Sequence, residues 1–294
     1  MKLLAGKRAW SRYCAAGLLA LSTATVSAAE AAAESNVLVH LGNWAGYVIK
    51  GDFRSVSATW VQPAVTCTNP GVFQRVVPWV GLNGANGPDN RVALPLMQTG
   101  AETGCISDAA VYATMPGLQL ENVAAGLVYT SPWLANQVMA AGDDLSNTLG
   151  GIADGLCATG ALGAACAPEQ GSDGWWEGYP DPPVIYEDVD VNAGDVMHAA
   201  VDWDGHVYTM TLENRTRNWR KVASQVSDAP ARTAEIVIEG HLDAALPGFT
   251  PVTFTEIEID GKPLSAYDAQ VYGIAATNRV LYPGPVDGSS FTLS

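Results

Sequence analysis

The sequence predicts an all-β fold, either a sandwich or a barrel. Many short segments of the 294-residue chain are rich in β-branched and aromatic residues, which favour strands. Turn signals such as Asp204-Gly205 and Asp260-Gly261 separate these segments. Strands do not alternate regularly with helical patterns, so a parallel α/β sheet is not expected.

Eight segments are expected to be strands. Each is short, apolar or alternating in polarity, and bounded by turn residues. They are residues 55–61, 77–82, 92–98, 184–191, 197–203, 206–212, 233–241 and 252–259. Asp204-Gly205 lies between two of them and predicts a tight β-hairpin.

The region of residues 101–173 differs in composition, because it is rich in Ala, Gly, Leu and Asn. Apolar residues recur with helical spacing between Trp133 and Ile152. We therefore expect a partly helical insertion here, within a single domain that extends over residues 36–294. A domain of this length is acceptable for an all-β fold.

The N-terminus has the three parts of a secretory signal peptide over residues 1–28. A basic head is followed by an apolar stretch from Ala15 to Leu21 and by small residues that end in Val26-Ser27-Ala28. The apolar stretch is too short for a permanent membrane anchor, which is the alternative. Residues 29–35 are expected to form a short disordered lead. We expect the mature chain to be secreted, either extracellular or periplasmic, and not bound to a membrane.

The charge balance is strongly acidic. The chain has 15 Lys and Arg against 30 Asp and Glu, and four of the basic residues lie in the expected signal peptide. The mature chain keeps 11 basic residues and has a net charge of −19. Nucleic acid is not an expected partner, because phosphate contacts need a basic patch. Such a surface tolerates acid, since few positive charges remain to repel one another. Solubility alone explains the same charge equally well.

Four cysteines remain once Cys14 is removed with the signal peptide. An even number of cysteines in an exported chain indicates disulfides. Of the three possible connectivities we favour Cys67–Cys105 with Cys157–Cys166, because each pair brackets a loop-like stretch. A metal site is the alternative, but the sequence has no CxxC spacing and no nearby His.

Most catalytic motifs are absent from the sequence. There is no GxSxG elbow, no GxGxxG or Walker-type loop, and no HExxH spacing among the four histidines. A Ser-His-Asp arrangement has no local signature, and it needs a neutral imidazole, which acid would protonate. Carboxylates, amides and aromatic residues remain as candidates.

Two segments carry polar residues in unusual places. In the strand expected around residues 233–239, Glu235, Val237 and Glu239 share one face by the two-residue period. A solvent-facing strand would show the same pattern. Gln98 ends an apolar run, where an amide needs hydrogen-bond partners. The alternative is that Gln98 begins a turn.

Short motifs along the chain resemble those of the eqolisin family of glutamic peptidases, and they occur in the family's order. The motifs are NWAGY (residues 43–47), VSATWVQP (56–63), WVGLNG (79–84), MQTG (97–100), WWEGYPD (175–181), AGD (193–195), LENRT (212–216) and AEIVIE (234–239). They cover most of the mature chain outside the expected insertion. Each motif alone is weak, whereas the ordered series is specific.

This resemblance implies a β-sandwich of two antiparallel sheets, of the concanavalin or lectin-like jelly-roll type, with the active site on a concave face. It also implies that Glu235 and Gln98 are the catalytic pair of an acid endopeptidase. Glu235 would take a proton from the attacking water and pass it to the leaving nitrogen. Gln98 would hold the water and stabilise the oxyanion. No metal, cofactor or covalent intermediate is implied.

The resemblance implies further roles around this pair. Trp79 and Trp175 are expected to form apolar walls for substrate side chains, with ordinary core packing as the alternative. Glu177 and Tyr179 are expected to bind substrate or to tune Glu235. The residues interpreted as structural or supporting are Trp44, Trp60 and Glu239.

The sequence departs from the family's pattern in three places. Ile236 stands where the family often has an aromatic residue, and Gly178 replaces a Trp. Both changes are expected to widen or reshape the cleft. The stretch between Gly100 and Trp175 is much longer than usual, and it follows Gln98 directly. We expect this stretch to cover or restrict the cleft.

Three other functions remain open. A non-catalytic carbohydrate-binding β-sandwich fits a secreted acidic chain with nine Trp, but it gives no reason for Glu235 and Gln98. A glycosidase with Glu177 and Glu235 as paired carboxylates leaves Gln98 unexplained. In the third, the inserted segment binds a protein partner. For the peptidase we expect polypeptide substrates and a monomeric protein.

Overall fold

The structure is a computed structural model that describes residues 39–68, 72–85, 95–127, 130–240 and 245–294. The expected signal peptide at residues 1–28 and the expected lead at residues 29–35 lie outside these ranges. Among the residues described, no helix is both long and apolar enough to cross a membrane.

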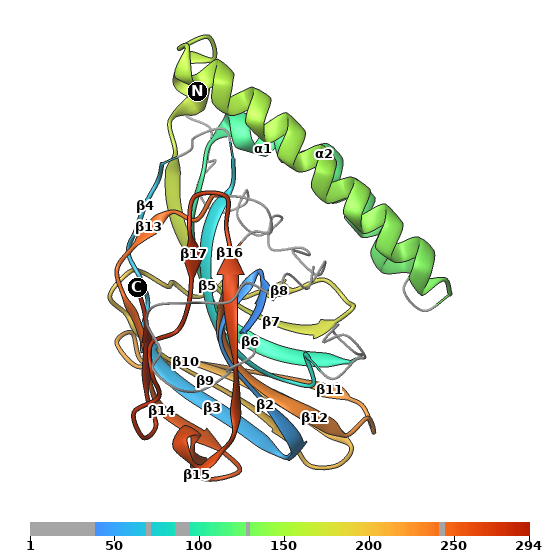
Figure 1. The fold of residues 1–294 in the computed structure, drawn as a ribbon, viewed down its shortest axis with the longest axis vertical. Coiled ribbons are helices and arrows are strands. Elements are labelled where there is room, and N and C mark those ends of the chain that lie inside the picture. The colour runs from blue at the N-terminus through green and yellow to red at the C-terminus, as the bar shows by residue number, and fades with distance from the viewer. Residues whose placement is uncertain (1–38, 69–71, 86–94, 128–129, 241–244) are drawn as a thin grey trace.

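Two β-sheets pack as a sandwich, and a helical hairpin projects from one end of it (Figure 1). The central strand pairs of the larger sheet are antiparallel, whereas β1 (Val39–Gly42) and β16 (Ala269–Ala275) run parallel at one edge. The all-β sandwich predicted from the sequence is confirmed.

The larger sheet has nine strands and the smaller has seven. In sheet order, the nine strands are β1 (Val39–Gly42), β16 (Ala269–Ala275), β2 (Trp44–Phe53), β12 (Ala231–Glu239), β5 (Gln74–Leu82), β6 (Leu96–Ile106), β7 (Glu169–Tyr179) and β8 (Val184–Ile185), with β17 (Val280–Leu281) on β16. The seven strands are β11 (Trp219–Val226), β10 (Val207–Asn214), β9 (Val196–Trp203), β3 (Ser55–Val61), β14 (Val252–Ile259) and β15 (Lys262–Pro263), with β18 (Phe291–Leu293) on β14. The remaining elements are the strand pair β4 (Val65–Thr66) and β13 (Gly248–Phe249) and the short helices η3 (Gly163–Cys166) and η4 (Leu264–Ala266).

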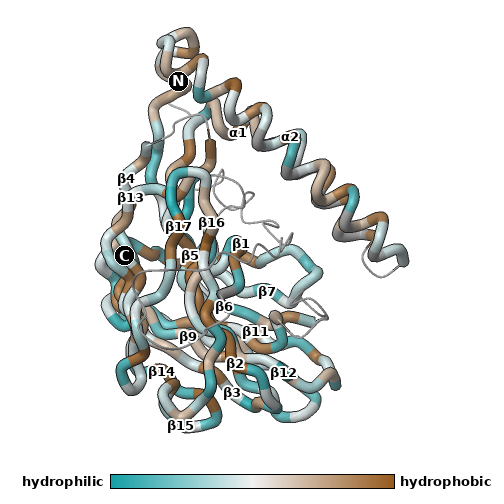
Figure 2. Tube along the Cα trace, viewed as in Figure 1, coloured by the Kyte–Doolittle hydropathy of each residue, from teal (hydrophilic) through white to brown (hydrophobic). Residues whose placement is uncertain are grey.

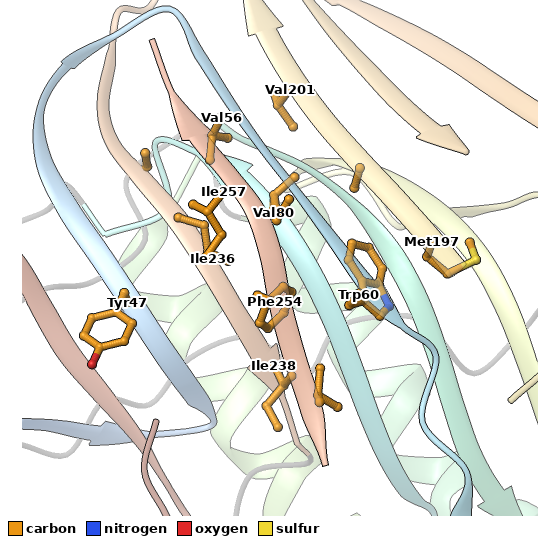
Figure 3. Packing of buried hydrophobic residues seen from close by; sticks show 14 of the residues in the cluster. Tyr47, Val56, Trp60, Val80, Met197, Val201, Ile236, Ile238, Phe254 and Ile257 are labelled. Carbon is orange, nitrogen blue, oxygen red and sulfur yellow. The ribbon is translucent and has the colours of Figure 1, made fainter. Parts of the chain in front are cut away.

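The main hydrophobic core lies between the two sheets. Ile236 and Ile238 of β12 point into it, where Trp60 and Phe254 also lie (Figure 3). Each large apolar side chain that is fully buried in this way contributes about 1.5–3 kcal/mol. Because side chains alternate along a strand, the residues between these isoleucines face the other side of the sheet.

Several predicted strands have the expected bounds. β3 covers residues 55–61 and β14 covers residues 252–259, as predicted. The hairpin at Asp204-Gly205 is confirmed, because Trp203 of β9 pairs with Tyr208 of β10 and Gly205 has a φ of 109°. The prediction for residues 184–191 is wrong beyond its first two residues, since only β8 (Val184–Ile185) pairs with β7.

Two helices occupy most of the stretch that was expected to be partly helical. They are α1 (Asp108–Leu127) and α2 (Pro132–Ala158), which pack on each other as a hairpin (Figure 1). Strand β6 continues to Ile106 and β7 begins at Glu169, so the helical part is shorter than residues 101–173. Figure 2 shows hydrophobic and hydrophilic residues mixed along α2.

Two disulfides lie next to the root of this hairpin. Cys105, near the end of β6, is bonded to Cys67, and Cys157 in the last turn of α2 is bonded to Cys166. Both predicted pairings are present. The first joins β6 to the segment after β4, just before α1 begins, and the second joins the last turn of α2 to η3.

Candidate active site

Four neighbouring strands place the candidate catalytic side chains in one row across the nine-stranded sheet. Glu235 of β12 lies opposite Gly81 of β5, and Gly81 lies opposite Gln98 of β6. Gln98 in turn lies opposite Glu177 of β7. Directly opposed residues in an antiparallel sheet point to the same face. The row therefore brings Glu235, Gln98 and Glu177 together on the face that is turned away from the core.

Gly81 has no side chain between Glu235 and Gln98, and neighbouring side chains pack closely beside it. A Cβ atom at this position would lie 2.8 Å from Cζ3 of Trp79 and 3.2 Å from Cβ of Gln98. The two flanking strands are about 10 Å apart, because strands in a sheet are spaced by about 4.8 Å. Glu235 and Gln98 thus flank a position without a side chain, beside the Trp79 indole.

Glu235 is fully buried, and its two carboxyl oxygens have different surroundings. Oε1 accepts hydrogen bonds from the backbone N–H groups of Gly84 at 3.0 Å and Ala85 at 3.2 Å. Oε2 has no hydrogen-bond partner among the described residues. Burial raises the pKa of Glu235 to about 8, although hydrogen bonds from Thr233 and the two backbone groups lower it. At acid pH the carboxyl therefore holds a proton, and Oε2 is available to exchange it.

The Gln98 carboxamide is fixed on one side by Glu177. Its Nε2 donates a hydrogen bond to Oε2 of Glu177, while its Oε1 has no partner within the described part of the chain. Burial, followed by the nearby charge of Glu239, raises the pKa of Glu177 to about 8. Glu177 was expected to bind substrate or to tune Glu235, but the structure places it against Gln98. It orients the amide and is neutral at acid pH.

Trp79 and Trp44 form an aromatic pair beside the row. Their ring centroids are 5.0 Å apart and their planes meet at 83°. Both indole N–H groups donate to Oε2 of Glu239 at 3.2 Å, and a guanidinium nitrogen of Arg75 lies 3.8 Å from Oε1 of Glu239. Burial raises the pKa of Glu239 to about 7, against the effect of Arg75. Glu239 thus holds the two indoles in place, which agrees with its predicted supporting role.

The other expected wall residues lie on the same face. Trp79, Gly100 and Trp175 follow one another across β5, β6 and β7, so the two indoles flank a residue without a side chain. Tyr179 is also buried on this face, two residues beyond Glu177. Trp60 lies in the core between the sheets, as interpreted from the sequence. Trp44 does not, because it packs against Trp79 on the site face.

The expectation that Ile236 and Gly178 widen the cleft is wrong. Both residues follow a site residue directly, so their side-chain directions are on the opposite face of the sheet. Ile236 is buried in the core between the sheets (Figure 3). A Cβ atom at Gly178 would clash with the Gln225 carboxamide of β11 in the smaller sheet. These two departures therefore lie in the packing between the sheets and not on the site face.

Sequence reasoning missed three residues that shape the site. Gly81 and Gly84 were visible only as parts of a motif, and Arg75 carried no signal of its own. Their positions follow from the strand register, which brings together residues that are far apart in the chain. The two glycines of the WVGLNG motif were a signal of a crowded site, because glycine permits other groups to approach the backbone closely.

No group of three or more His, Cys, Asp or Glu side chains that could hold a metal ion is present within the described ranges.

The model of the family described as "Peptidase A4 family" matches residues 42–125 and 119–294. The chain belongs to the peptidase A4 family. The matched residues contain the whole row from Glu235 to Glu177, and the resemblance to the eqolisins found in the sequence is confirmed.

Solved structures share the sandwich with this A4 family member. Two structures of scytalido-glutamic peptidase, each with a transition-state analogue, are 19% identical to the chain and have TM-scores of 0.54 and 0.52. SCP-B, a member of the eqolisin family of peptidases in a complex with the tripeptide Ala-Ile-His, is 18% identical with a TM-score of 0.51. Each match covers 86% of this chain and 98% of the other. No match was found among curated proteins.

Proposed function

We propose that the protein is a secreted endopeptidase that cleaves peptide bonds at acid pH with Glu235 and Gln98. The row of Glu235, Gly81 and Gln98 carries this proposal, because two polar side chains flank a position without one. Membership of the A4 family supports a peptidase. The two disulfides and the signal-like N-terminus support secretion.

Gln98 holds the attacking water and stabilises the oxygen of the reacting carbonyl. Its Oε1 is free to accept a hydrogen bond from the water. Its Nε2 carries two hydrogens, of which one is donated to Glu177 and the other is left for the carbonyl oxygen. An amide does not titrate, so both functions persist in acid. One donor of this kind contributes about 3–4 kcal/mol to lowering the barrier.

Glu235 moves the protons. Because its pKa is raised to about 8, it starts protonated in acid. It gives the proton on Oε2 to the carbonyl oxygen as water attacks the carbonyl carbon, and then takes a proton from that water, which leaves a neutral gem-diol. A second transfer protonates the leaving nitrogen, the C–N bond breaks, and a hydroxyl proton of the gem-diol returns to Glu235. This order differs from the base-first order expected from the sequence.

The neighbouring side chains keep this chemistry in place. Backbone N–H groups hold Oε1 of Glu235, so Oε2 is the oxygen that faces the reactants. Glu177 holds the amide of Gln98 in one orientation. The Trp79 indole lies next to Gly81 and limits the space over it. Such fixed groups lower the barrier because they need little reorganisation during the reaction.

Digestion of a denatured protein tests the proposal. The wild-type protein is expected to cleave it at pH 3–4 and to be much less active above pH 8. Gln98→Ala is expected to lose about 100-fold or more of the rate, the usual effect of losing one oxyanion donor. Glu258→Gln, an exposed change on the smaller sheet, serves as the control and should retain full activity. Absence of cleavage by the wild-type protein at every pH would refute the proposed function.

A further inference from the structure

Three more buried polar atoms on the site face have no hydrogen-bond partner among the described residues. They are Oε1 of Gln270, the hydroxyl of Tyr272 and Nε1 of Trp175. Buried polar groups are seldom left without a partner, so each of them needs an explanation. Together with Oε2 of Glu235 and Oε1 of Gln98, they make a set of buried hydrogen-bonding atoms on one face of the sheet that could be satisfied by a polar chain.

The strand register places Gln270 and Tyr272 on the Glu235 side of the site. Gln270 of β16 lies opposite Val48 of β2, and Val48 lies opposite Glu235, so Gln270 extends the catalytic row. Tyr272 lies opposite Gly46, which has no side chain to cover it. Trp175 lies at the other end of the site, on β7.

Tyr272 is held rigidly, although its hydroxyl is unpartnered. Its exposed fraction is 2%, and its ring packs against those of His40 at 4.8 Å and Trp44 at 6.3 Å. Burial raises the pKa of Tyr272, and the charge of Glu235 raises it further. The phenol therefore remains a hydrogen-bond donor at every pH at which the protein would work.

We propose that Tyr272 and Gln270 form a further subsite for the polypeptide substrate, on the Glu235 side of the bond that is cleaved. This inference rests on the proposed function. The Tyr272 hydroxyl donates to a substrate carbonyl, and Oε1 of Gln270 accepts from a substrate N–H. Every extended peptide presents these two groups, so the subsite binds the main chain and does not select side chains.

The width of the sheet sets the length of peptide that reaches this subsite. β16 and β7 are separated by β2, β12, β5 and β6, so five strand spacings of about 4.8 Å give about 24 Å. An extended peptide rises by about 3.4 Å per residue, so about seven residues reach from Trp175 to Tyr272. A shorter peptide contacts only one end.

Tyr272→Phe removes only the hydroxyl and is the direct test. We expect about a three- to tenfold lower kcat/KM for an eight-residue peptide, the usual effect of one hydrogen bond. Peptides are then shortened from each end in turn. Shortening from one end only should abolish the difference between Tyr272→Phe and wild type. Gln270→Ala should show the same dependence on length.

Tyr47→Phe is the matched control, because the Tyr47 hydroxyl already donates to the carbonyl oxygen of Gly284 at 2.9 Å. It should leave kcat/KM unchanged for every peptide. It should also lower the urea midpoint, which is the urea concentration at which half of the protein is unfolded. Tyr272→Phe should leave the urea midpoint equal to or above that of wild type, because a buried hydroxyl without a partner adds no stability.

A lower urea midpoint for Tyr272→Phe would overturn the subsite, since the hydroxyl would then serve the fold. An equal loss of kcat/KM for peptides of every length would overturn it too. If the wild-type protein cleaves no peptide, the proposed function fails. The subsite is then tested by the affinities of wild type and variant for the peptide, measured by Trp fluorescence in place of kcat/KM. Equal affinities of wild type and Tyr272→Phe for the eight-residue peptide would then contradict the subsite independently.

Discussion

At the scale of single residues, the site depends as much on missing side chains as on those present. Gly81 separates Glu235 from Gln98, and Gly100 separates Trp79 from Trp175. Any other residue at these positions would place a Cβ atom against Trp79, and at Gly100 also against the carbonyl oxygen of Pro78. The two glycines thus let Trp79 pack closely against the sheet beside the catalytic row.

Gly81→Ala tests whether this close packing matters for the reaction. The added methyl group would lie 2.8 Å from Trp79 and 3.2 Å from Cβ of Gln98, so one of these side chains must shift. We expect kcat/KM to fall by at least tenfold, because displacements of about 1 Å in an active site are costly. Gly151→Ala in α2 is the control, since no heavy atom lies within 4 Å of its Cβ position. Wild-type kcat/KM in Gly81→Ala would show that the positions of Trp79 and Gln98 beside Gly81 do not matter for the reaction.

Glu239 links the aromatic pair to a buried ion pair. It accepts hydrogen bonds from Trp44, Trp79 and Asn43, and it faces Arg75, which also pairs with Glu102 at 3.4 Å. We expect Glu239→Ala to lower the free energy of unfolding by about 3–5 kcal/mol, because several buried donors lose their acceptor. Urea unfolding at pH 5 measures this.

The exposed Glu258→Ala on β14 is the reference for that measurement, with an expected change of less than about 0.5 kcal/mol. A loss of less than about 1 kcal/mol in Glu239→Ala would show that the indoles are held by packing alone.

At the scale of elements, the helical hairpin is built differently from the sandwich. Where burial in α1 and α2 is described, the buried residues are mostly small, with Met139 as an exception, and a Cβ atom at Gly117 would clash with Ser146. Large apolar side chains such as Tyr112 and Trp133 are instead exposed, at 75% and 73%. The hairpin is therefore expected to be the least stable part of the fold.

Removal of the hairpin is expected to leave peptide cleavage unchanged. Ile106 of β6 pairs with Glu169 of β7, so Asn-Gly in place of residues 107–168 can close a two-residue hairpin. Gln98 lies about 27 Å along β6 from this turn, given a rise of about 3.4 Å per residue. The kcat/KM for an eight-residue peptide should stay within about twofold of wild type.

A deletion variant that unfolds cooperatively but loses more than tenfold in kcat/KM would contradict this independence. It would support the expectation from the sequence that the inserted stretch covers the cleft.

Strands whose residues alternate clearly in polarity were predictable from the sequence. Strands that form mainly because they pair with a neighbouring strand were not. β3 and β14 alternate in polarity and were found with their observed bounds. β7 begins with Glu-Gln-Gly-Ser-Asp-Gly, which reads as a loop, but it pairs along its whole length with β6. In the segment of residues 184–191, acidic residues follow the two that pair, and the chain turns away. Tertiary pairing outweighs local propensity in these cases.

The candidate site was partly predictable for a similar reason. Glu235 and Gln98 were found through motifs. The residues that lie opposite them on neighbouring strands were not found, because cross-strand contacts leave no local pattern in the sequence. The two-residue period of a strand predicts that Ile236 points to the face opposite Glu235. The expectation that Ile236 affects the cleft did not take this into account. The contact of Glu177 with Gln98 depends on the order of β6 and β7 in the sheet, which the sequence does not reveal.

At the scale of the whole molecule, buried carboxyls make stability depend on pH. Burial raises the pKa of Glu177 and Glu235 to about 8 and that of Glu239 to about 7, from an ordinary value of 4.5. The unfolded chain therefore loses these protons at lower pH than the folded chain does. Stability is fully present below about pH 4.5 and falls as the pH rises towards 8.

Urea midpoints measured from pH 3 to pH 9 test this linkage. The midpoint should be highest near pH 4 and fall steadily up to about pH 8. Glu235→Gln removes one of the three groups, so its midpoint should fall less steeply over the same range. Below about pH 4 a loss is expected from Asp195, because hydrogen bonds from Asn214 and Arg217 outweigh burial and lower its pKa. A midpoint that rises from pH 5 to pH 8 would contradict the raised pKa values.

The ratio of kcat/KM between wild type and Glu235→Gln, measured on one peptide at pH 4, tests the central claim most directly. Glutamine keeps the size of the side chain and an acceptor for the N–H groups of Gly84 and Ala85, but it cannot carry a proton. We predict a loss of about 1,000-fold or more, because both proton transfers are removed. Cleavage by Glu235→Gln at a rate within tenfold of wild type would contradict the account.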